Sequence, residues 1–434
     1  MKRVKTILLK GLMGVGSRGL GAGLGFAMNI GITHYLPVSE AGLFYLGLNL
    51  LMAISILPRF GFENSLIRFI APRWKEQATG IISGIYRTAF ATSVVLGIVF
   101  GAISWYFAEW LASTLFSKPE FVDVIIMVAL ALVPFSVARL HCGVLKGLRK
   151  PILATFYEAG AIPGVVLLAI GLVAWLSSAA ITAHGLMAIY ATASVLVAIV
   201  GGWVYYTKIK LSSQAVDYAK SPEMLRASLP IMGAIGLNFV MLWSGSLILG
   251  ILADSQDVAL YNVAHRTAFL ISFIIMVANN FVAPRYAIYH ENEQIDRIEN
   301  LARLTSLSLI LFTTPLLLAI FLFSEQILWV FGPNYALAAP MLVVIALGQY
   351  VNTITASVQF QLTMTGNENA VMKVNLLIML CSIPVNYLLI TLYGGIGAAA
   401  SFALLMTVKN VILVVVVKKK LGVSMFGIPK TLHL

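Results

Sequence analysis

Apolar stretches long enough to cross a lipid bilayer recur along the whole chain, with short polar segments between them. A helix that spans the hydrocarbon core needs about 20 mostly apolar residues. The chain offers twelve such stretches, at residues 10–36, 41–69, 81–108, 121–146, 152–176, 186–207, 229–252, 259–288, 303–323, 337–364, 371–392 and 396–417. The pattern predicts an all-α polytopic membrane protein with twelve transmembrane helices.

The two halves of the chain carry similar short segments in the same order. The matched pairs are SEAGLFY (39–45) with QDVALY (256–261), APR (71–73) with APR (283–285), and LKG (145–147) with MTG (364–366), the last pair being followed by Ile162–Pro163 and Ile383–Pro384. Six helices per half is an even number, so both halves enter the membrane in the same direction, as in parallel transporter repeats. We therefore expect two parallel six-helix bundles around a central cleft. The expected domains are an N-terminal bundle (1–207), a cytoplasmic connecting segment (208–228), and a C-terminal bundle with a short cytoplasmic tail (229–434).

Composition supports this fold class. Only 11% of the residues are charged and 60% are hydrophobic, whereas a soluble domain carries about 25% charged residues. Such a chain cannot cover itself with a hydrated surface, which excludes soluble enzymes, nucleic-acid-binding domains and secreted disulfide scaffolds. Cys142 and Cys381 lie far apart, so we expect neither a disulfide nor a metal site. The basic start, MKRVKTILLKG, lacks a small-residue cleavage site and is interpreted as the cytoplasmic lead-in to a retained first helix.

The distribution of charge predicts the orientation. The chain has 29 Lys and Arg against 17 Asp and Glu, a net charge of +12, and the basic residues cluster at alternate helix ends, as the positive-inside rule requires. With the N-terminus inside, the outer loops hold one basic residue, Lys118, and the acidic residues Glu40, Glu109, Glu120, Asp123, Asp254, Asp257 and Glu325. Only Arg18, Arg59 and Arg266 are counted as lying well inside spans. We predict a multi-pass protein of the cytoplasmic (inner) membrane with both termini in the cytoplasm and no nucleic-acid partner.

No motif in the sequence indicates catalysis. There is no G-x-x-x-x-G-K-[ST] loop for nucleotide phosphates, no His/Glu constellation of a metalloprotease, and no segment large enough to form a soluble catalytic domain. We predict a non-enzymatic protein without a metal or cofactor.

Small and polar residues follow one face of the first predicted helix. Steps of three or four residues connect Gly11, Gly14, Arg18, Gly21, Gly25, Asn29 and Thr33. A charge inside the membrane costs about 2.5–3.5 kcal/mol, so Arg18 is expected to face water or to serve a function. In the alternative interpretation, the glycines allow close helix packing and Arg18 extends to the cytoplasmic headgroups.

The second predicted span carries Tyr45, Asn49, Arg59 and Glu63 on one face, with Gly61 as a bend. Arg59 and Glu63 are four residues apart and are expected to form an ion pair that offsets part of their desolvation. Either this pair belongs to a functional cavity, or it only allows the helix to insert.

Two further spans contribute polar side chains. Asn262, His265 and Arg266 share a face of the eighth span, where Arg266 is expected to face a cavity. His265 is either a proton carrier or a hydrogen-bonding wall residue. The tenth span carries an uncharged stripe that includes Gln349 and Asn352. Such amides suit sugar hydroxyls, and they suit interhelical hydrogen bonds equally well.

Guanidinium groups recognise phosphate through planar, charge-assisted hydrogen bonds. A cavity that contains Arg18, Arg59 and Arg266 with few acids favours an anion over a cation. We predict a substrate with a diphosphate and a large hydrated head, contacted by these arginines and by the amides of Asn29, Asn49, Asn262, Gln349 and Asn352. A lipid tail attached to such a substrate would stay in the bilayer.

The run LPVSEAGLFYLGLNLLMAISILPRFGFENSLIRFIA (36–71) resembles the start of a Wzx-type polysaccharide-biosynthesis flippase. That family lies within the superfamily that also holds multidrug exporters and lipid II flippases. The resemblance implies alternating-access transfer of an undecaprenyl-diphosphate-linked oligosaccharide to the outer leaflet. It implies membrane lipids and a polysaccharide polymerase or other export machinery as partners.

The same resemblance assigns roles to individual residues. Related lipid II flippases depend on arginines in the first, second and eighth helices, and the resemblance gives these roles to Arg18, Arg59 and Arg266. It matches Glu40 to an acidic position, and Glu63 and His265 are further candidates for coupling or gating. The chain departs from the lipid II flippases in having twelve predicted spans rather than fourteen.

Three other functions compete with the flippase. A cation-coupled multidrug exporter of the same superfamily would need an acid in the first helices, where this chain has Arg18. A membrane-embedded glycan polymerase or ligase would need a large outer loop, and the outer segments near 109–120, 177–185 and 324–336 are short. A structural scaffold would use the arginines only as anchors.

Overall fold

A computed structural model of the protein describes residues 2–176, 181–209 and 215–427. Within these ranges all regular structure is helical, and nine helical stretches are long and apolar enough to cross a membrane. The remaining predicted spans fall on α1 (Lys2–Tyr35), on the interrupted pair α11 (Ser255–Ala268) and α12 (Phe273–Glu291), and on α16 (Glu368–Leu421), which covers two spans. The predicted all-α polytopic fold with twelve spans is therefore confirmed.

The chain divides into two compact units, Met1–Gly236 and Leu237–Leu434. The division falls inside α10 (Ser221–Leu252). The predicted connecting segment 208–228 includes the start of this helix, and its residues 210–214 lie outside the described ranges, as do residues 428–434 of the predicted tail.

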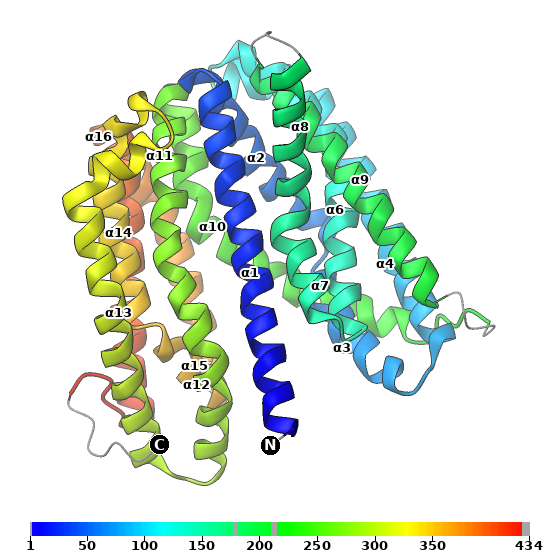
Figure 1. Ribbon diagram of the computed structural model, residues 1–434, viewed down its shortest axis with the longest axis vertical. Coiled ribbons are helices and arrows are strands. Elements are labelled where there is room, and N and C mark those ends of the chain that lie inside the picture. The colour runs from blue at the N-terminus through cyan, green and yellow to red at the C-terminus, as the bar shows by residue number, and fades with distance from the viewer. Residues whose placement is uncertain (1, 177–180, 210–214, 428–434) are drawn as a thin grey trace. The chain divides into compact units, whose positions relative to one another are not determined.

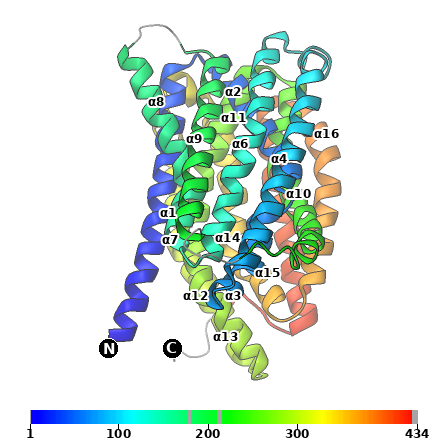
Figure 2. The ribbon, with the colours of Figure 1, turned by 90° about the vertical axis from the view of Figure 1, so that its right-hand side faces the viewer.

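The first unit, here called unit 1, is organised around one very apolar helix, α6 (Val122–Gly147). Its other elements are α1, α2 (Val38–Arg59), α3 (Phe62–Lys75), α4 (Thr79–Tyr106), α5 (Ala108–Trp110), η1 (Leu111–Leu115), η2 (Pro119–Phe121), α7 (Pro151–Phe156), η3 (Tyr157–Ala161), α8 (Ile162–Leu176), α9 (Ala183–Ile209) and the first half of α10. Four of them, α2, α3, α4 and α9, pack against α6, and Figures 1 and 2 both show α6 beside α4 and α9. Phe62, Ile85 and Leu140 belong to one buried cluster that joins α3, α4 and α6.

The second unit, unit 2, has α14 (Ala339–Ile354) in the equivalent role. Its other elements are the second half of α10, α11, η4 (Phe269–Ser272), α12, α13 (Ile295–Trp329), η5 (Pro333–Ala338), α15 (Ser357–Met364) and α16. Helix α14 packs against α11, α13 and α16, and Figure 1 shows it next to α13. Within α16 the backbone leaves helical geometry at Gly394 (φ 55°, ψ −134°), between the two spans predicted at 371–392 and 396–417.

The repeated sequence motifs occupy equivalent places in the two units. SEAGLFY opens α2 and QDVALY opens α11, the second membrane-spanning helix of each unit. The acid in each motif accepts a backbone N–H from the start of the sixth span: Glu40 Oε2 accepts from Ala183 N at 2.6 Å, and Asp257 accepts from Gly395 N. Burial and the neighbouring Asp254 carboxylate raise the pKa of Asp257, which stands just before the predicted span 259–288.

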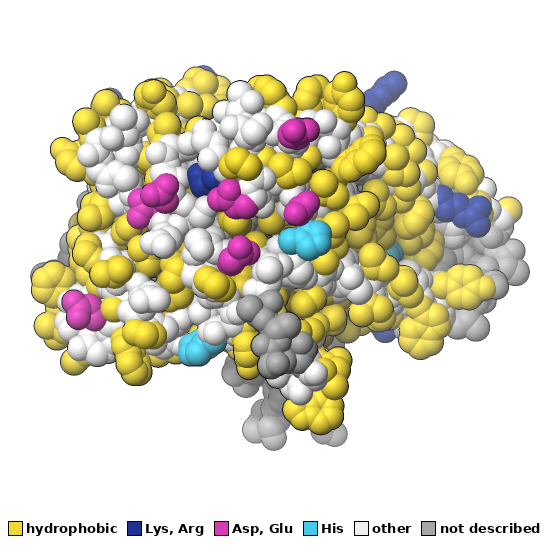
Figure 3. Space-filling view, turned by 90° about the horizontal axis from the view of Figure 1, so that it is seen from above, with side chains coloured by type: hydrophobic (Ala, Val, Ile, Leu, Met, Phe, Trp, Pro, Cys, Tyr) yellow, Lys and Arg dark blue, Asp and Glu magenta, His cyan; other side chains and the backbone are white. Residues whose placement is uncertain are grey.

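The end of unit 1 at which α2 begins is acidic. Glu40, Glu109, Glu120 and Asp123 stand at this end, and Figure 3, which views the chain from above, shows separate acidic side chains among hydrophobic ones. Lys118, the basic residue predicted for the outer loops, is 7% exposed, and its Nζ donates to the Phe116 carbonyl at 3.2 Å. Its positive charge therefore contributes little to that surface.

Candidate functional site

A helix break places the first two charges of the site. Helix α2 ends at Arg59, and α3 begins at Phe62 after two residues in the left-handed conformation, Phe60 (φ 48°) and Gly61 (φ 74°). The bend predicted at Gly61 is therefore confirmed. Across this break, Arg59 Nη2 lies 2.7 Å from Glu63 Oε1, and each of the two side chains is 15% exposed. The predicted ion pair between them is confirmed as well.

Glycines on α6 bring this break against a third helix. A Cβ on Gly143 would lie 2.8 Å from the Glu63 carbonyl oxygen, and one on Gly147 would lie 2.8 Å from Ile70 Cβ. Two glycines four residues apart allow such close helix approach within membranes. The start of α3 therefore lies directly on the stretch of α6 that carries Arg139 and Lys146.

Arg139 and Lys146 extend the ion pair into a cluster. Arg139 Nη1 donates to the Glu158 carbonyl at 2.9 Å, and Lys146 Nζ lies 2.7 Å from Glu158 Oε2. Arg139 also attracts the Glu63 carboxylate electrostatically. We call Arg59, Glu63, Arg139, Lys146 and Glu158 the ionic cluster. It contains three cations and two carboxylates, so it carries one net positive charge.

Glu158 belongs to η3, a single π-helical turn between α7 and α8. Such turns are rare, and they occur frequently at functional sites. Helix α1 packs closely on this turn, because a Cβ on Gly21 would lie 2.7 Å from Ala159 Cβ. The close-packing role foreseen for the glycine face of α1 thus applies at Gly21.

The other predicted residues of unit 1 occupy separate positions. Arg18 is partly exposed, one helical turn before Gly21 on α1. Asn29 is 6% exposed, and its Nδ2 donates to the Gly25 carbonyl at 2.7 Å, within its own helix. Asn49 is completely buried on α2. Glu40 lies at the opening of α2, where it holds the first turn of α9.

In unit 2, His265 is enclosed by aromatic rings. The ring centroids of Trp243, Tyr261, Phe269 and Phe402 lie 4.8–5.6 Å from that of His265. The His265 side chain is completely buried, and neither ring nitrogen has a hydrogen-bond partner among the described residues. Of the two roles left open for His265, the hydrogen-bonding one has no observed bond.

Arg266, the next residue, packs on the same aromatic group. Its guanidinium carbon lies 5.6 Å from the centroid of the Trp243 ring, a cation–π contact. Asn262, one turn earlier, is completely buried, and its Nδ2 donates to Ser246 Oγ at 2.9 Å. Asn262 therefore joins α10 to α11.

The amides of α14 bond to neighbouring helices. Gln349 is completely buried, and its Oε1 accepts from Ser272 Oγ at 2.9 Å and from Asn352 Nδ2 at 3.3 Å. Asn410 Nδ2 of α16 donates to Asn352 Oδ1 at 3.2 Å. Gln349 and Asn352 thus form one continuous network with Ser272 and Asn410.

The chain matches known families of membrane proteins. The polysaccharide biosynthesis protein family matches residues 9–290, well over half of the chain. The chain belongs to this family. A second family, MatE, matches residues 230–388. Over 398 residues the chain is 23% identical to a "probable low-salt glycan biosynthesis flippase Agl15" of Haloferax volcanii DS2, in an alignment that covers 90% of this chain and 79% of the relative.

Solved structures of transporters share the fold of this chain. A lipid II flippase, MurJ, in its inward closed conformation aligns with a TM-score of 0.76 at 11% identity, over 94% of this chain and 87% of that one. An inward-facing multidrug resistance MATE family transporter aligns with a TM-score of 0.72 at 14% identity, over 95% and 98% of the two chains. A transporter from Pyrococcus furiosus of the same superfamily aligns with a TM-score of 0.64 at 16% identity, over 95% and 94%. This protein is therefore a multi-pass membrane protein of that fold, and the predicted family is confirmed.

The sequence pattern does not single out two further cations within the predicted spans, Arg139 and Lys409. The charge distribution groups both with the cytoplasmic residues, whereas the structure places Arg139 in the ionic cluster and leaves Lys409 only 5% exposed within α16. Each stands eight residues or fewer from the end of its predicted span, a distance that a long side chain can bridge to the headgroups. For Arg139, the Gly143–Gly147 spacing one turn later was the available signal that α6 packs closely at this level.

Proposed function

We propose that the protein is a flippase that moves a lipid-linked oligosaccharide of the undecaprenyl-diphosphate type across the cytoplasmic membrane by alternating access. The proposed transfer needs no catalytic group. The proposal takes Arg18, Arg59 and Arg266 as the groups that bind the diphosphate, and it adds Arg139 as a fourth cation near Arg59. Polymerase or other export machinery is proposed to receive the transferred glycan.

The observation that carries the proposal is the excess of positive charge in the ionic cluster. Its two carboxylates neutralise two of its three cations, and a further cation, Arg18, lies on a helix that packs against η3. In a medium of low dielectric constant an uncompensated cation is unfavourable. A diphosphate would supply the missing negative charge, and guanidinium groups would bind it through paired hydrogen bonds.

The proteins similar to this chain support the proposed flippase function. The match to a protein named as a glycan biosynthesis flippase extends over most of both chains. The fold is shared with a lipid II flippase. A positively charged site within a membrane protein can bind the phosphate of a lipid-linked glycan. The lipid tail of that glycan would stay in the bilayer.

The buried amides have a different part in this proposal. Asn49, Asn262 and Gln349 have no exposed surface in this conformation, so we propose that they hold the helices together. Asn352 is partly exposed and Asn29 is buried at 6% exposure; both remain proposed for contact with the polar head. Glu40, Glu63 and His265 remain proposed as coupling or gating residues.

The test is transfer of a fluorescent undecaprenyl-diphosphate oligosaccharide in reconstituted vesicles. The triple variant Arg18→Ala, Arg59→Ala, Arg266→Ala is expected to lose transfer, while Arg68→Ala, an exposed arginine of α3, is expected to retain it. Normal transfer by a folded triple variant would refute the proposal. Collapse of the proton and sodium gradients in the same vesicles tests ion coupling, which is excluded if transfer continues at the full rate.

A multidrug exporter is the second candidate, because the MatE family matches residues 230–388 and MATE transporters share the fold. An exporter of organic cations would need acidic side chains free to receive them. In unit 1, however, Glu63 and Glu158 are already paired with Arg59 and Lys146. Transport of an organic cation such as ethidium into the same vesicles, with no transfer of the glycolipid, would favour the exporter.

A further inference from the structure

One end of unit 2 contains a pocket that the proposed transfer does not use. Helix α13 leaves regular geometry at Phe323 (φ −125°, ψ 23°) and continues to Trp329. Gly332 (φ 117°) then turns the chain into η5 and the first turns of α14. These segments form an open pocket of about 710 Å³, lined by Ser324, Glu325, Pro333, Ala336, Leu337, Ala339, Pro340, Val343 and Val344.

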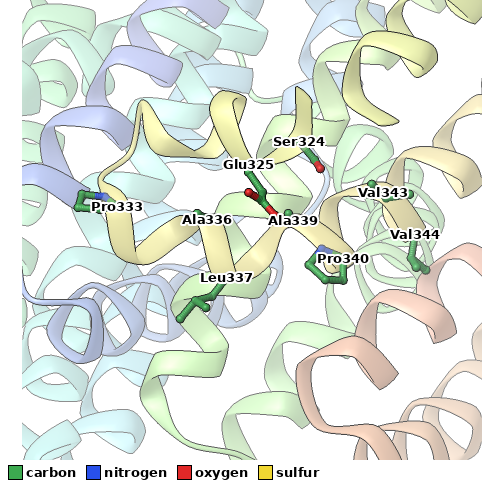
Figure 4. A pocket seen from close by; sticks show the side chains of 9 residues that line it. All are labelled: Ser324, Glu325, Pro333, Ala336, Leu337, Ala339, Pro340, Val343 and Val344. Carbon is green, nitrogen blue, oxygen red and sulfur yellow. The ribbon is translucent and has the colours of Figure 1, made fainter. Parts of the chain in front are cut away.

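The lining combines one carboxylate with aliphatic walls. Figure 4 shows the Glu325 side chain among the lining residues, between Pro333 on one side and Pro340 on the other. Apart from Ser324, the rest of the lining is aliphatic. Among the described residues no Lys or Arg lies within ion-pair distance of Glu325. A carboxylate with apolar neighbours and no cation is electrostatically suited to a positively charged ligand.

The position of the pocket indicates where that ligand comes from. Glu325 stands two residues after the predicted span 303–323, where we expect the lipid headgroups to begin. Trp329 and Leu337 beside it are 64% and 73% exposed, and Trp is enriched at the membrane–water interface. An adjoining hollow shares Glu325, Pro333 and Ala336 and includes Trp329. The pocket therefore opens beside apolar side chains that suit acyl chains.

We propose that this pocket binds the ammonium-bearing headgroup of a membrane phospholipid, of which phosphatidylethanolamine is the simplest. The ammonium group contacts the Glu325 carboxylate, and the acyl chains lie along the exposed side chains of Leu337 and Trp329. The volume lies within the range of about 300–1,000 Å³ that ligand pockets occupy. This inference does not depend on the proposed flippase function, because it concerns a resident lipid and not the transported one.

The experiment is native mass spectrometry of the delipidated protein after equal additions of phosphatidylethanolamine and phosphatidylglycerol. The wild type is expected to retain phosphatidylethanolamine preferentially. Glu325→Gln removes the charge and is expected to lower that preference about tenfold. Ala336→Phe keeps the charge but fills the pocket, and it is expected to lower retention similarly.

A matched control is Glu109→Gln. Glu109 is an exposed acid beside the exposed Trp110 in unit 1, and it lines neither of the pockets described above. It is expected to leave lipid retention unchanged. Unchanged preference in Glu325→Gln would overturn the proposal. If free ethanolamine displaces phosphatidylethanolamine at equal concentration, the acyl chains contribute nothing to binding. That result would overturn the proposal that the ligand is a lipid.

Discussion

Single residues decide whether the charges of the ionic cluster meet. Gly61 adopts a positive φ that L side chains rarely adopt, and it is also in close contact with α10, since a Cβ there would lie 2.7 Å from the Ser228 carbonyl oxygen and 2.9 Å from Met232 N. Both the conformation and the space therefore require glycine. The turn it permits aligns Arg59 with Glu63.

We expect Gly61→Ala to destabilise the protein by at least about 1–2 kcal/mol from the left-handed conformation alone, with a further cost from the contact with α10. The matched control is Gly233→Ala in α10, where nothing lies within 4 Å of the added Cβ. That change is expected to be neutral or slightly stabilising, because alanine favours a helix over glycine. Thermal unfolding in detergent measures both, and equal melting temperatures for the two variants would contradict the steric argument.

The ion pair of Arg59 and Glu63 gives a second residue-scale prediction. Removing one partner of a buried pair leaves an uncompensated charge and costs about 3–5 kcal/mol, whereas replacing both partners is far less costly. Glu63→Gln alone should therefore lower the stability more than the double change Arg59→Met, Glu63→Gln. The double variant is expected to recover only part of the stability lost in Glu63→Gln, because Arg139 also interacts with Glu63. A double-mutant cycle from unfolding measurements decides this, and strictly additive effects would show that the two side chains do not interact.

Sequence spacing predicts local partners better than distant ones. Arg59 and Glu63 are four residues apart, so helical periodicity alone pairs them. Arg139 bonds to the Glu158 carbonyl and interacts electrostatically with Glu63 through the packing of separate helices, which spacing cannot predict. The sequence shows Gln349 and Asn352 as a polar stripe that suits either sugar contact or helix packing. In the structure they accept hydrogen bonds from side chains on η4 and α16, which is helix packing.

At the scale of elements, each span predicted from hydrophobicity falls on helix in the structure. A run of about 20 apolar residues can be recognised from its length and composition alone. The interruptions were harder to predict. The break at Gly61 carries a glycine that marks it. The π turn η3 and the 3₁₀ turn η4 have no comparable local residue, because packing against neighbouring helices determines them.

The acids that open α2 and α11 lead to an element-scale prediction. Glu40 and Asp257 each accept a backbone N–H at the start of the sixth span of their unit, where the helix has unpaired donors and a partial positive charge. A hydrogen bond to a charged group contributes about 1.5–3 kcal/mol. Glu40→Ala is therefore expected to accelerate amide hydrogen exchange about tenfold or more in the first turn of α9, and Asp257→Ala is expected to do the same around Gly395.

The control for this pair is Glu109→Ala, which removes an exposed acid from the same predicted outer side. Exchange in α9 and near Gly395 should be unchanged in that variant. If Glu40→Ala leaves the protection of Ala183 as it is in the wild type, the carboxylate does not stabilise the start of α9. In that case Glu40 would be better explained as a surface charge.

At the scale of the whole molecule, charge asymmetry predicts orientation independently of any side-chain contact. In unit 2 the acids Asp254, Asp257 and Glu325 stand at one end of the helices. The opposite end carries seven basic residues, Arg285, Arg297, Arg303, Lys373, Lys418, Lys419 and Lys420, and five acids, Glu291, Glu293, Asp296, Glu299 and Glu368. Intramembrane cations such as Arg139 and Lys409 change the count but not its sign. By the positive-inside rule we expect the basic end to lie in the cytoplasm.

Cysteine labelling tests this orientation. In a background with Cys142→Ala and Cys381→Ser, we expect Glu120→Cys, exposed in η2, to react with a membrane-impermeant maleimide on intact spheroplasts. Glu291→Cys, exposed at the end of α12, is expected to react only after the membrane is permeabilised. One end of each unit presents mainly carboxylates and the other an excess of ammonium and guanidinium groups, and we expect membrane insertion to retain the basic end on the cytoplasmic side. The reverse labelling pattern would show that this asymmetry of basic residues does not determine the orientation of the chain.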